Sequence, residues 1–251
     1  MKSISEIIKQ FEPISLGEMD EVRLLDRVDV KYLFHVNQLA EVLALSVPYY
    51  RILTISGLRY GKYETRYFDT PDYEMYTNHH NGKLNRYKIR FRTYVESNLN
   101  FFEIKFKTKT GRTRKSRIKY ESQDFKIVGD SQVLLEQTTN YYAKALNEAI
   151  QINYNRITLV NRDKTERLTI DFNITDIYQN TQYKHPNLVI AEVKQDKAQR
   201  SAFIELMKSK HISTTSMSKY CLGIANCVQD VKINQFKSKL LYVNKLCNPN
   251  T

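Results

Sequence analysis

The chain is poor in glycine, proline and cysteine and contains no tryptophan: its 251 residues include seven Gly, five Pro and three Cys. The cysteines, Cys221, Cys227 and Cys247, have no C-x-x-C spacing, which excludes a disulfide framework and is typical of reduced thiols. No run approaches the roughly 18 apolar residues of a membrane span, and the N-terminus lacks the apolar core of a signal peptide. We therefore expect a soluble, cytoplasmic protein.

The composition predicts one domain with an anionic partner. No Pro/Gly/Ser-rich linker or fixed-period repeat divides the sequence, so we expect a single domain over residues 1–251, with a core of about 20–228, a short N-terminal helix and a Lys-rich C-terminal tail. Eighteen Tyr and eleven Phe favour a β-rich fold. The net charge of +12 predicts an anionic partner, with nucleic acid, an acidic membrane surface and a phosphorylated small molecule all open.

Between residues 86 and 119 cations recur at every second position of three strand-like segments. Successive side chains of a strand point to opposite faces, so the cations of each segment share one face. These residues are Arg86, Lys88, Arg90 and Arg92 in the first segment, Lys105 and Lys107 in the second, and Lys115, Arg117 and Lys119 in the third. Like charges on neighbouring strands repel unless a polyanion lies among them. The pattern therefore predicts a phosphate-rich ligand.

The remaining pattern predicts an α+β fold. Further strands are expected over 20–34, 50–56, 63–70, 155–162, 166–174 and 187–195, and helices over 36–46, 130–152, 198–208 and 218–227. About eight strands with short connections suggest a closed antiparallel β-barrel with flanking helices, in which the cationic faces line a tunnel. The alternative is an open sheet whose basic face meets water.

Carboxylates share strand faces with these cations. Glu103 lies beside Lys105, Asp171 beside Arg167, and Glu192 beside Lys194 in strand parity. Such oxygen ligands among phosphate-binding cations suggest a divalent metal, Mn²⁺ or Mg²⁺. For any single pair, a plain cross-strand salt bridge is the competing interpretation.

Eight motifs occur in the order in which they are found in one known family. They are Arg27-Val-Asp-Val-Lys-Tyr-Leu-Phe-His35, Tyr67-Phe-Asp-Thr-x-x-Tyr73, Ile89-Arg-Phe-Arg-x-Tyr94, Glu103-Ile-Lys105, Asn161-Arg162, Glu166-Arg-Leu-Thr-Ile-Asp171, Glu192-Val-Lys194 and Ser218-Lys-Tyr220. Over roughly residues 20 to 225 the chain thus resembles the VTC-type polyphosphate polymerase domain of the CYTH-like, or triphosphate tunnel metalloenzyme, superfamily.

The resemblance implies an eight-stranded tunnel that holds a triphosphate and a divalent metal, with ATP and polyphosphate as ligands. The implied phosphate-binding residues are Lys31, Arg90, Arg92, Lys105, Lys115, Arg162, Lys194, Ser218 and Lys219. To these we add the strand cations Arg66, Lys107 and Arg117. The expected catalytic residues are Arg90, Arg92, Lys105, Lys219 and Glu192. Glu192 is also the implied metal ligand, with Glu103 and Asp171 as further candidates.

The leading hypothesis is therefore a polymerase that transfers the γ-phosphoryl group of ATP to a growing polyphosphate chain. A triphosphatase with water as acceptor and a non-catalytic polyphosphate-binding module are the alternatives. Two departures from the superfamily bear on the site: the first strand reads Arg27-x-Asp29-x-Lys31 instead of E-x-E-x-K, and Ser216 stands where the polymerases often carry Lys. We expect no nucleic-acid partner, because duplex binders display their cations outward. A membrane partner protein and the oligomeric state are left open by the sequence.

Overall fold

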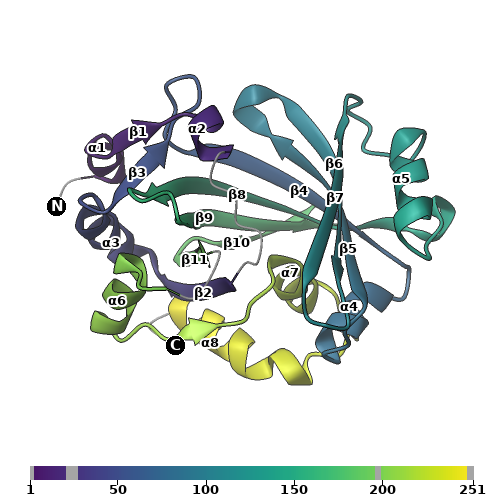
Figure 1. Cartoon of the computed structure of the whole chain (residues 1–251). Helices are drawn as coiled ribbons and strands as arrows, with labels where there is room; N and C mark the ends of the chain where they lie inside the picture. Colours follow the sequence, from purple (N-terminus) through teal and green to yellow (C-terminus); the bar gives the residue numbers. More distant parts are fainter. Residues whose placement is uncertain (1–2, 21–27, 196–198, 248–251) are drawn as a thin grey trace.

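The computed structural model describes residues 3–20, 28–195 and 199–247. Its strands form one 12-stranded sheet against which the helices pack (Figure 1), which confirms the predicted α+β class. Arg27, at the start of the first motif, and Ala198, at the start of a predicted helix, lie outside the described residues.

Eight strands form a continuous antiparallel run through the sheet. In spatial order they are β2 (Val28–His35), β11 (Leu188–Gln195), β9 (Glu166–Tyr178), β8 (Asn147–Asn161), β4 (Gly61–Asp69), β5 (Arg86–Tyr94), β6 (Leu99–Lys107) and β7 (Thr113–Tyr120). Four shorter strands extend it: β12 (Thr214–Thr215) beside β2, β10 (Thr181–His185) beside β9, β3 (Tyr50–Leu53) beside β8, and β1 (Glu12–Ile14) beside β3.

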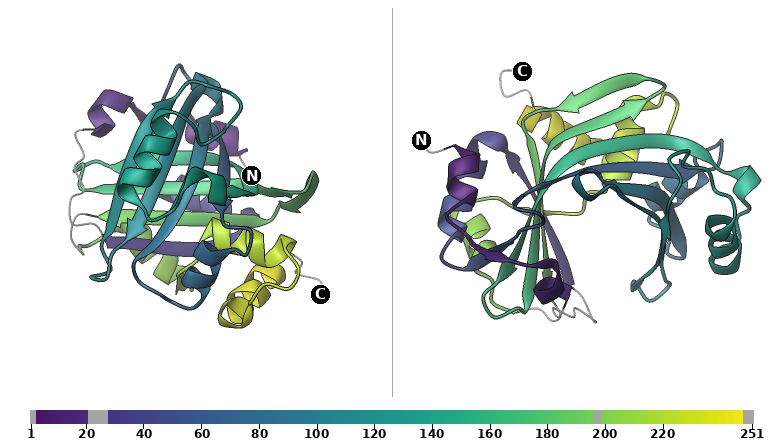
Figure 2. Two further views of the ribbon diagram at one scale, coloured as in Figure 1. Left: turned by 90° about the vertical axis from the view of Figure 1, so that its right-hand side faces the viewer. Right: turned by 90° about the horizontal axis from the view of Figure 1, so that it is seen from above.

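The sheet is curved but, within the described residues, no pairing closes it between β7 and β12. The expectation of a closed barrel is corrected in this respect, and the strand count is higher than eight. Register shifts at Tyr67/Phe68 and at Asn153/Asn155 mark bulges, which bend strands locally. In Figure 1, β5–β7 accordingly run up the view while β8 and β9 run across it, and Figure 2 shows the arch from above.

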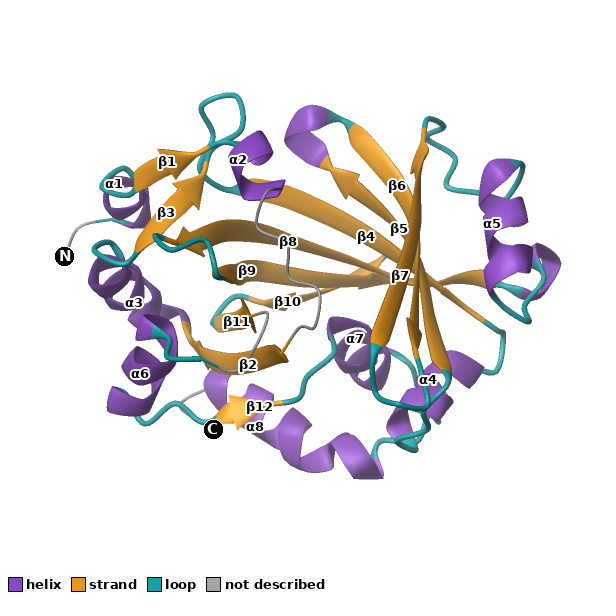
Figure 3. Cartoon of the chain, in the orientation of Figure 1, coloured by secondary structure: helices purple, strands orange, loops and turns teal. Residues whose placement is uncertain are grey.

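The helices cover both faces of the curved sheet (Figure 3). They are α1 (Ile4–Ile8), α2 (Leu16–Asp20), α3 (Leu39–Ser46), α4 (Glu74–His80), α5 (Asp130–Thr138), α6 (Ala202–Ser209), α7 (Lys219–Cys227) and α8 (Lys237–Cys247), with single 3-10 turns at Val36–Gln38, Val95–Ser97, Ala143–Ala145 and Asn234–Phe236. None of the helices in the described ranges is both long and apolar enough to cross a membrane.

Three large apolar clusters hold this arrangement together, and a small fourth one joins Ile14, Met19 and Val160. Residues of α1, α3 and α6 pack on β2, β9 and β11. Residues of α5 pack on the outer face of β5–β7, where Ile89 and Phe91 are fully buried. Residues of α4, α7 and α8 pack with β8, and α7 also contacts β9. On the inward face, α7 covers Ile150 and Ile152 of β8, and the positions beside them carry polar side chains such as Arg90, Arg156 and Glu192.

The helix predicted over 130–152 is wrong beyond residue 138. The hydroxyls of Thr138 and Thr139 donate to the carbonyls of Leu134 and Leu135, and Thr139 is already extended, so α5 ends there. The strand β8 begins at Asn147, eight residues earlier than predicted from residue 155. Its buried residues at 149–152 satisfy an apolar helix stripe equally well, which explains the error.

Candidate functional site

The cations of β5, β6 and β7 lie side by side on the inner face of the sheet. In register, Lys88 faces Lys105, which faces Lys115 on the next strand. One step along, Arg90 faces Glu103, which faces Arg117. Directly opposed residues of paired strands share a face, so alternation in the sequence becomes a two-dimensional array of charge.

Glu103 is the centre of this array. Its side chain is fully buried and accepts hydrogen bonds from Arg90 Nε at 2.7 Å and Nη2 at 2.5 Å. Lys115 forms an ion pair with the same carboxylate, and Arg92 Nη1 lies 3.8 Å from it. Burial alone would raise the pKa of Glu103, but the charges of Arg90, Arg92 and Lys115 outweigh it and hold the pKa well below its usual range. Glu103 is therefore ionised and orients three cations.

Asp171 of β9 is a second carboxylate that binds cations of the site. Arg156 of β8 donates bidentately to Asp171, from Nε at 2.6 Å and Nη2 at 2.8 Å. Lys219, at the start of α7, donates to the same carboxylate. Burial raises the pKa of Asp171, yet the charges of Arg156 and Lys219 lower it to about 2 overall. The carboxylate thus anchors one cation from the sheet and one from a helix.

Glu192 is the third carboxylate of the site, and its side chain is 19% exposed. It lies between Lys31 Nζ of β2, at 2.6 Å, and Lys194 Nζ of its own strand. Burial raises the pKa of Glu192, but Lys194 and Lys31 hold it well below the usual range. Lys31 faces Glu192 in register, so the first and last motifs of the sheet meet here.

Two lysines connect these three groups into one site. Lys88 donates to Ser218 Oγ at 2.8 Å, and burial, with the charges of Arg86, Arg90 and Lys31, lowers the pKa of Lys88 to about 8. The charge of Arg90, then burial and the charge of Arg92, hold the pKa of Lys105 well below its usual range. Burial is the main cause of the lowered pKa of Lys88, whereas the positive charge of Arg90 is the main cause for Lys105.

We call the resulting set the cation cluster. It comprises Lys31, Lys88, Arg90, Arg92, Lys105, Lys115, Arg156, Lys194 and Lys219. Three carboxylates lie among these side chains: Glu103 and Asp171 are buried, and Glu192 is partly buried. A cluster of this kind attracts a compact polyanion, because guanidinium groups bind phosphate oxygens bidentately and ammonium groups bind them as point charges.

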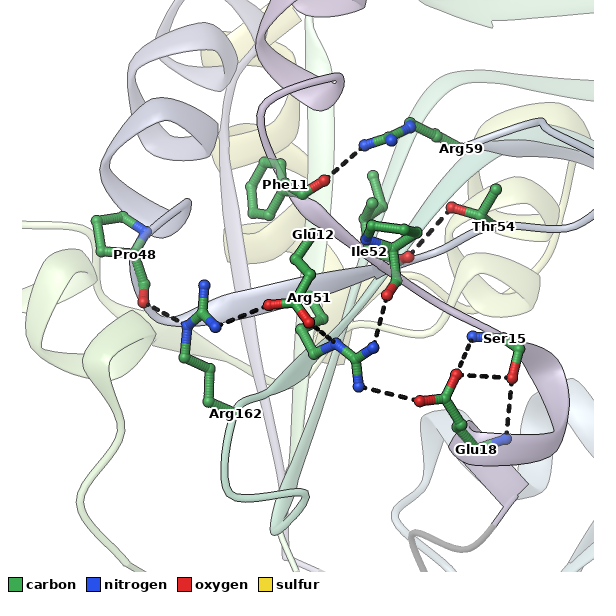
Figure 4. A network of polar contacts seen from close by, with 11 residues as sticks. Phe11, Glu12, Ser15, Glu18, Pro48, Arg51, Ile52, Thr54, Arg59 and Arg162 are labelled. Carbon is green, nitrogen blue, oxygen red and sulfur yellow. Dashed lines mark hydrogen bonds and ion pairs between the residues drawn. The ribbon is translucent and has the colours of Figure 1, made fainter.

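The structure leaves two predicted phosphate contacts outside the cluster. Arg66 is on the opposite face of β4, because Tyr67 faces inward; it pairs with Glu148 at 3.0 Å and lies over the Phe125 ring. Arg162 follows the end of β8 and bonds Glu12 and the Pro48 carbonyl near the N-terminal segment (Figure 4).

Three other predicted residues lie at the border of the cluster. Lys107 is half-buried and faces Arg86 in register. Arg117 is exposed, and its guanidinium lies 4.8 Å from the Phe101 ring centroid. Ser218 lies inside the border, where its hydroxyl caps α7 and accepts the hydrogen bond from Lys88.

The predicted phosphate contacts omit two cations of the cluster, Arg156 and Lys88. Lys88 carries the same alternation as Arg90 and was available from the sequence. Arg156 is the second residue of the strand predicted from residue 155. It lies opposite Asp171 because a bulge at Asn153/Asn155 shifts the register between β8 and β9, and this shift is not visible in the sequence. Tyr67 was not predicted as a site residue. It is uncharged, and its hydroxyl accepts a hydrogen bond from Arg90 Nη1 at 3.2 Å.

A divalent metal fits this site only together with its substrate. No group of three or more His, Cys, Asp or Glu side chains that could hold a metal occurs in the described ranges, so the protein alone does not form a cage. Mg²⁺ is commonly bound by one or two carboxylates plus substrate phosphates. Glu192, Glu103 and Asp171 each offer a single ionised carboxylate beside the cations, which matches that donor set.

Comparison with solved structures shows similar folds. The fold is similar to that of a candidate adenylate cyclase from Bacillus halodurans, with a TM-score of 0.53 and 13% identity over 82% of this chain and 100% of that one. A candidate adenylyl cyclase from Hippeastrum that reveals a dominant triphosphatase activity has a TM-score of 0.53 and 12% identity, over 81% of this chain and 98% of that one.

Sequence comparison gives the family directly. No curated protein is similar enough to this chain to be counted as a relative. The VTC domain family, in contrast, matches residues 26–228, which include all three carboxylates and every cation of the cluster. Since this match covers well over half of the sequence, the chain belongs to the VTC domain family, as its motifs predicted.

Proposed function

We propose that this protein is a metal-dependent polyphosphate polymerase, which transfers the γ-phosphoryl group of ATP to a growing polyphosphate chain and releases ADP. The observation that carries the proposal is the excess of cations over carboxylates on one curved sheet face. Such an excess is costly without a polyanion, and it is matched in charge by a triphosphate lying next to a phosphate chain.

The chemistry needs positioning more than a protein nucleophile. Phosphoryl transfer proceeds largely by in-line placement of donor and acceptor and by neutralising charge on the transferred group. Arg90 and Arg156 are already oriented by Glu103 and Asp171, so their guanidinium groups are preorganised donors. Lys105 and Lys219 carry compact point charges on flexible stems and would follow the phosphates as they move.

The metal would be held by Glu192 and by phosphate oxygens. When bound, it would neutralise charge on the phosphates as a Lewis acid. Lys31 and Lys194 keep the Glu192 carboxylate ionised and pointed into the cluster. Glu103 and Asp171 are more fully enclosed by their cations, which supports Glu192 as the principal ligand.

A triphosphatase that uses the same site is the second candidate. The triphosphatase activity reported for the Hippeastrum protein of similar fold favours it. The two reactions differ only in the acceptor, a terminal phosphate or water. A binding module without turnover is the third.

Incubation of pure protein with ATP and Mn²⁺, followed by electrophoresis that separates long polyphosphate from phosphate, tests the proposal. Long polyphosphate together with ADP is the expected result. Free phosphate as the sole product would replace the polymerase by the triphosphatase. If neither product forms although ATP binds, the binding module is the correct assignment.

A further inference from the structure

A pocket on the outer face of the sheet lies apart from the cation cluster. Its walls come from the end of β4, the start of β8 and the two segments that flank α5, at the right of Figure 1. Its volume is about 360 Å³, and pockets for small ligands measure roughly 300–1,000 Å³. The apolar part of the lining consists of Phe68, Phe125, Ile127, Ala143 and Leu146. All five belong to the apolar cluster on the outer face of β5–β7, so the pocket does not open onto the inner face.

The wall that Phe125 forms is held in one conformation. Its backbone has a φ of 50°, in the left-handed region that bulky side chains rarely adopt. The Tyr120 hydroxyl lies 2.7 Å from the Asp124 carboxylate and 2.8 Å from the Lys126 carbonyl, and so fixes the chain on both sides of Phe125. Strained residues persist only where the surrounding structure holds them, and they cluster at ligand sites. The pocket is therefore preformed, and a ligand does not have to order this loop.

The charged groups of the pocket leave it positive. Glu148 is the carboxylate among the lining residues, and Arg66 Nη1 donates to both of its oxygens, at 3.0 and 3.1 Å. The Arg66 guanidinium also lies 4.8 Å from the Phe125 ring centroid. Lys126 and Lys144 line the pocket as well, both are exposed, and neither forms an ion pair within the part of the chain that the structure describes. Since Arg66 neutralises Glu148, these two ammonium groups remain to attract an anion.

We propose that this pocket binds a small amphipathic anion, with an apolar ring system and one carboxylate, sulfonate or phosphate group. The ring system fills the space between Phe68, Ile127 and Leu146, where aromatic and aliphatic side chains provide the apolar contact. The anionic group lies at the rim between Lys126 and Lys144. The site is independent of the proposed function, because it shares no residue with the cation cluster and its ligand is mainly apolar.

Fluorescence titration of the full chain with anilinonaphthalene sulfonate, which carries fused rings and one sulfonate, tests the proposal. The titration is done in excess tripolyphosphate, so that the polyanion and not the probe occupies the cation cluster. We expect saturable binding of one probe molecule per chain. Ala143→Trp places an indole in the pocket and should weaken probe binding by roughly 10- to 100-fold, the value of the apolar contact that the ring system loses. Lys144→Glu should weaken it by roughly 5- to 10-fold, because it reverses one of the two rim charges.

Ala145→Trp is the matched control for Ala143→Trp, since Ala145 is exposed, lies two residues further along the chain and does not line the pocket. Lys237→Glu, at an exposed position of α8, is the control for the charge reversal. Both controls should leave probe affinity unchanged. If Ala143→Trp fails to fold, Lys144→Glu at its exposed position decides. The proposal is overturned if the unmodified protein does not bind the probe, or if the pocket variants weaken binding no more than their controls do. Neither result bears on polymerase activity, which is measured separately by product formation from ATP.

Discussion

The hydroxyl of Tyr220 donates a hydrogen bond to Asp69, a residue 151 positions earlier at the end of β4. The Asp69 carboxylate is fully buried and also accepts the backbone N–H groups of Met75 and Tyr76, each at 2.9 Å, in the first turn of α4. One carboxylate thus joins a strand and the beginnings of two helices. Tyr220 directly follows Lys219, whose ammonium donates to Asp171, so the same turn of α7 is tied to β4 and to β9.

Tyr220→Phe should lower the free energy of unfolding by about 1.5–3 kcal/mol, the usual contribution of a hydrogen bond to a charged group. It should also reduce turnover, since α7 loses its tether next to Lys219. Urea unfolding followed by circular dichroism measures the first effect. Tyr242→Phe, which removes a half-buried hydroxyl bonded to the Leu33 carbonyl, is the control for loss of a hydroxyl away from Lys219.

Arg90→Ala should weaken triphosphate binding by roughly 10- to 100-fold, because it deletes a charge-assisted bidentate donor. It should also destabilise the fold, since Glu103 stays buried with fewer partners. Arg66→Ala is a matched control on the neighbouring strand, where the guanidinium faces outward and pairs with Glu148. Equal losses of affinity in the two variants would mean that the inner face is not the binding site.

Glu192→Gln should abolish metal-dependent turnover while leaving triphosphate affinity the same or higher. Glutamine keeps the shape of the side chain but removes the charge that attracts the metal. It also releases Lys31 and Lys194, which then bind phosphate more freely. Nucleotide affinity and product formation are measured on the same preparation, with Glu148→Gln on the outer face as control. A folded Glu192→Gln variant with full activity would exclude Glu192 as the metal ligand.

Triphosphate affinity should fall as the pH rises through about 8. The pKa of Lys88 in the free protein is lowered to about 8 by burial and neighbouring cations, so this ammonium loses its proton above that pH. Phosphate, with a second pKa of about 6, is already ionised and does not offset the loss. Lys88→Met should flatten the pH dependence between 7 and 9.5 and lower the affinity at pH 7. An affinity of the unmodified protein that is constant over this range would contradict the assignment.

Removal of divalent metal with EDTA should stop product formation without changing the melting temperature of the protein alone. The described residues contain no cluster of three metal-ligating side chains, so no structural metal is expected to contribute to folding. Thermal unfolding with and without EDTA, in the absence of nucleotide, is the measurement. A lower melting temperature in EDTA would point to a resident structural metal.

The inner-face cations of β5–β7 were predictable because strand alternation is local. In any strand over these residues, Arg90 and Arg92 lie on one face and Ile89 and Phe91 on the other, independently of the rest of the fold. Arg66 was assigned to the site because it is a cation on a predicted strand. The local sequence of β4, however, does not show which of its two faces points inward. That choice depends on Tyr67, which faces Arg90 on the next strand.

Strand alternation, the charge of +12 and the ordered motifs were determined by the sequence alone, and they sufficed for the α+β class and the family. Tertiary structure decided which cations share a carboxylate. Arg156 meets Asp171 through a bulged register, Lys219 reaches it from a helix, and Lys31 meets Glu192 across strands far apart in the chain. It also decided that the sheet stays open within the described residues. Register, bulges and helix docking are set by packing between distant segments, and a local pattern carries no record of those contacts.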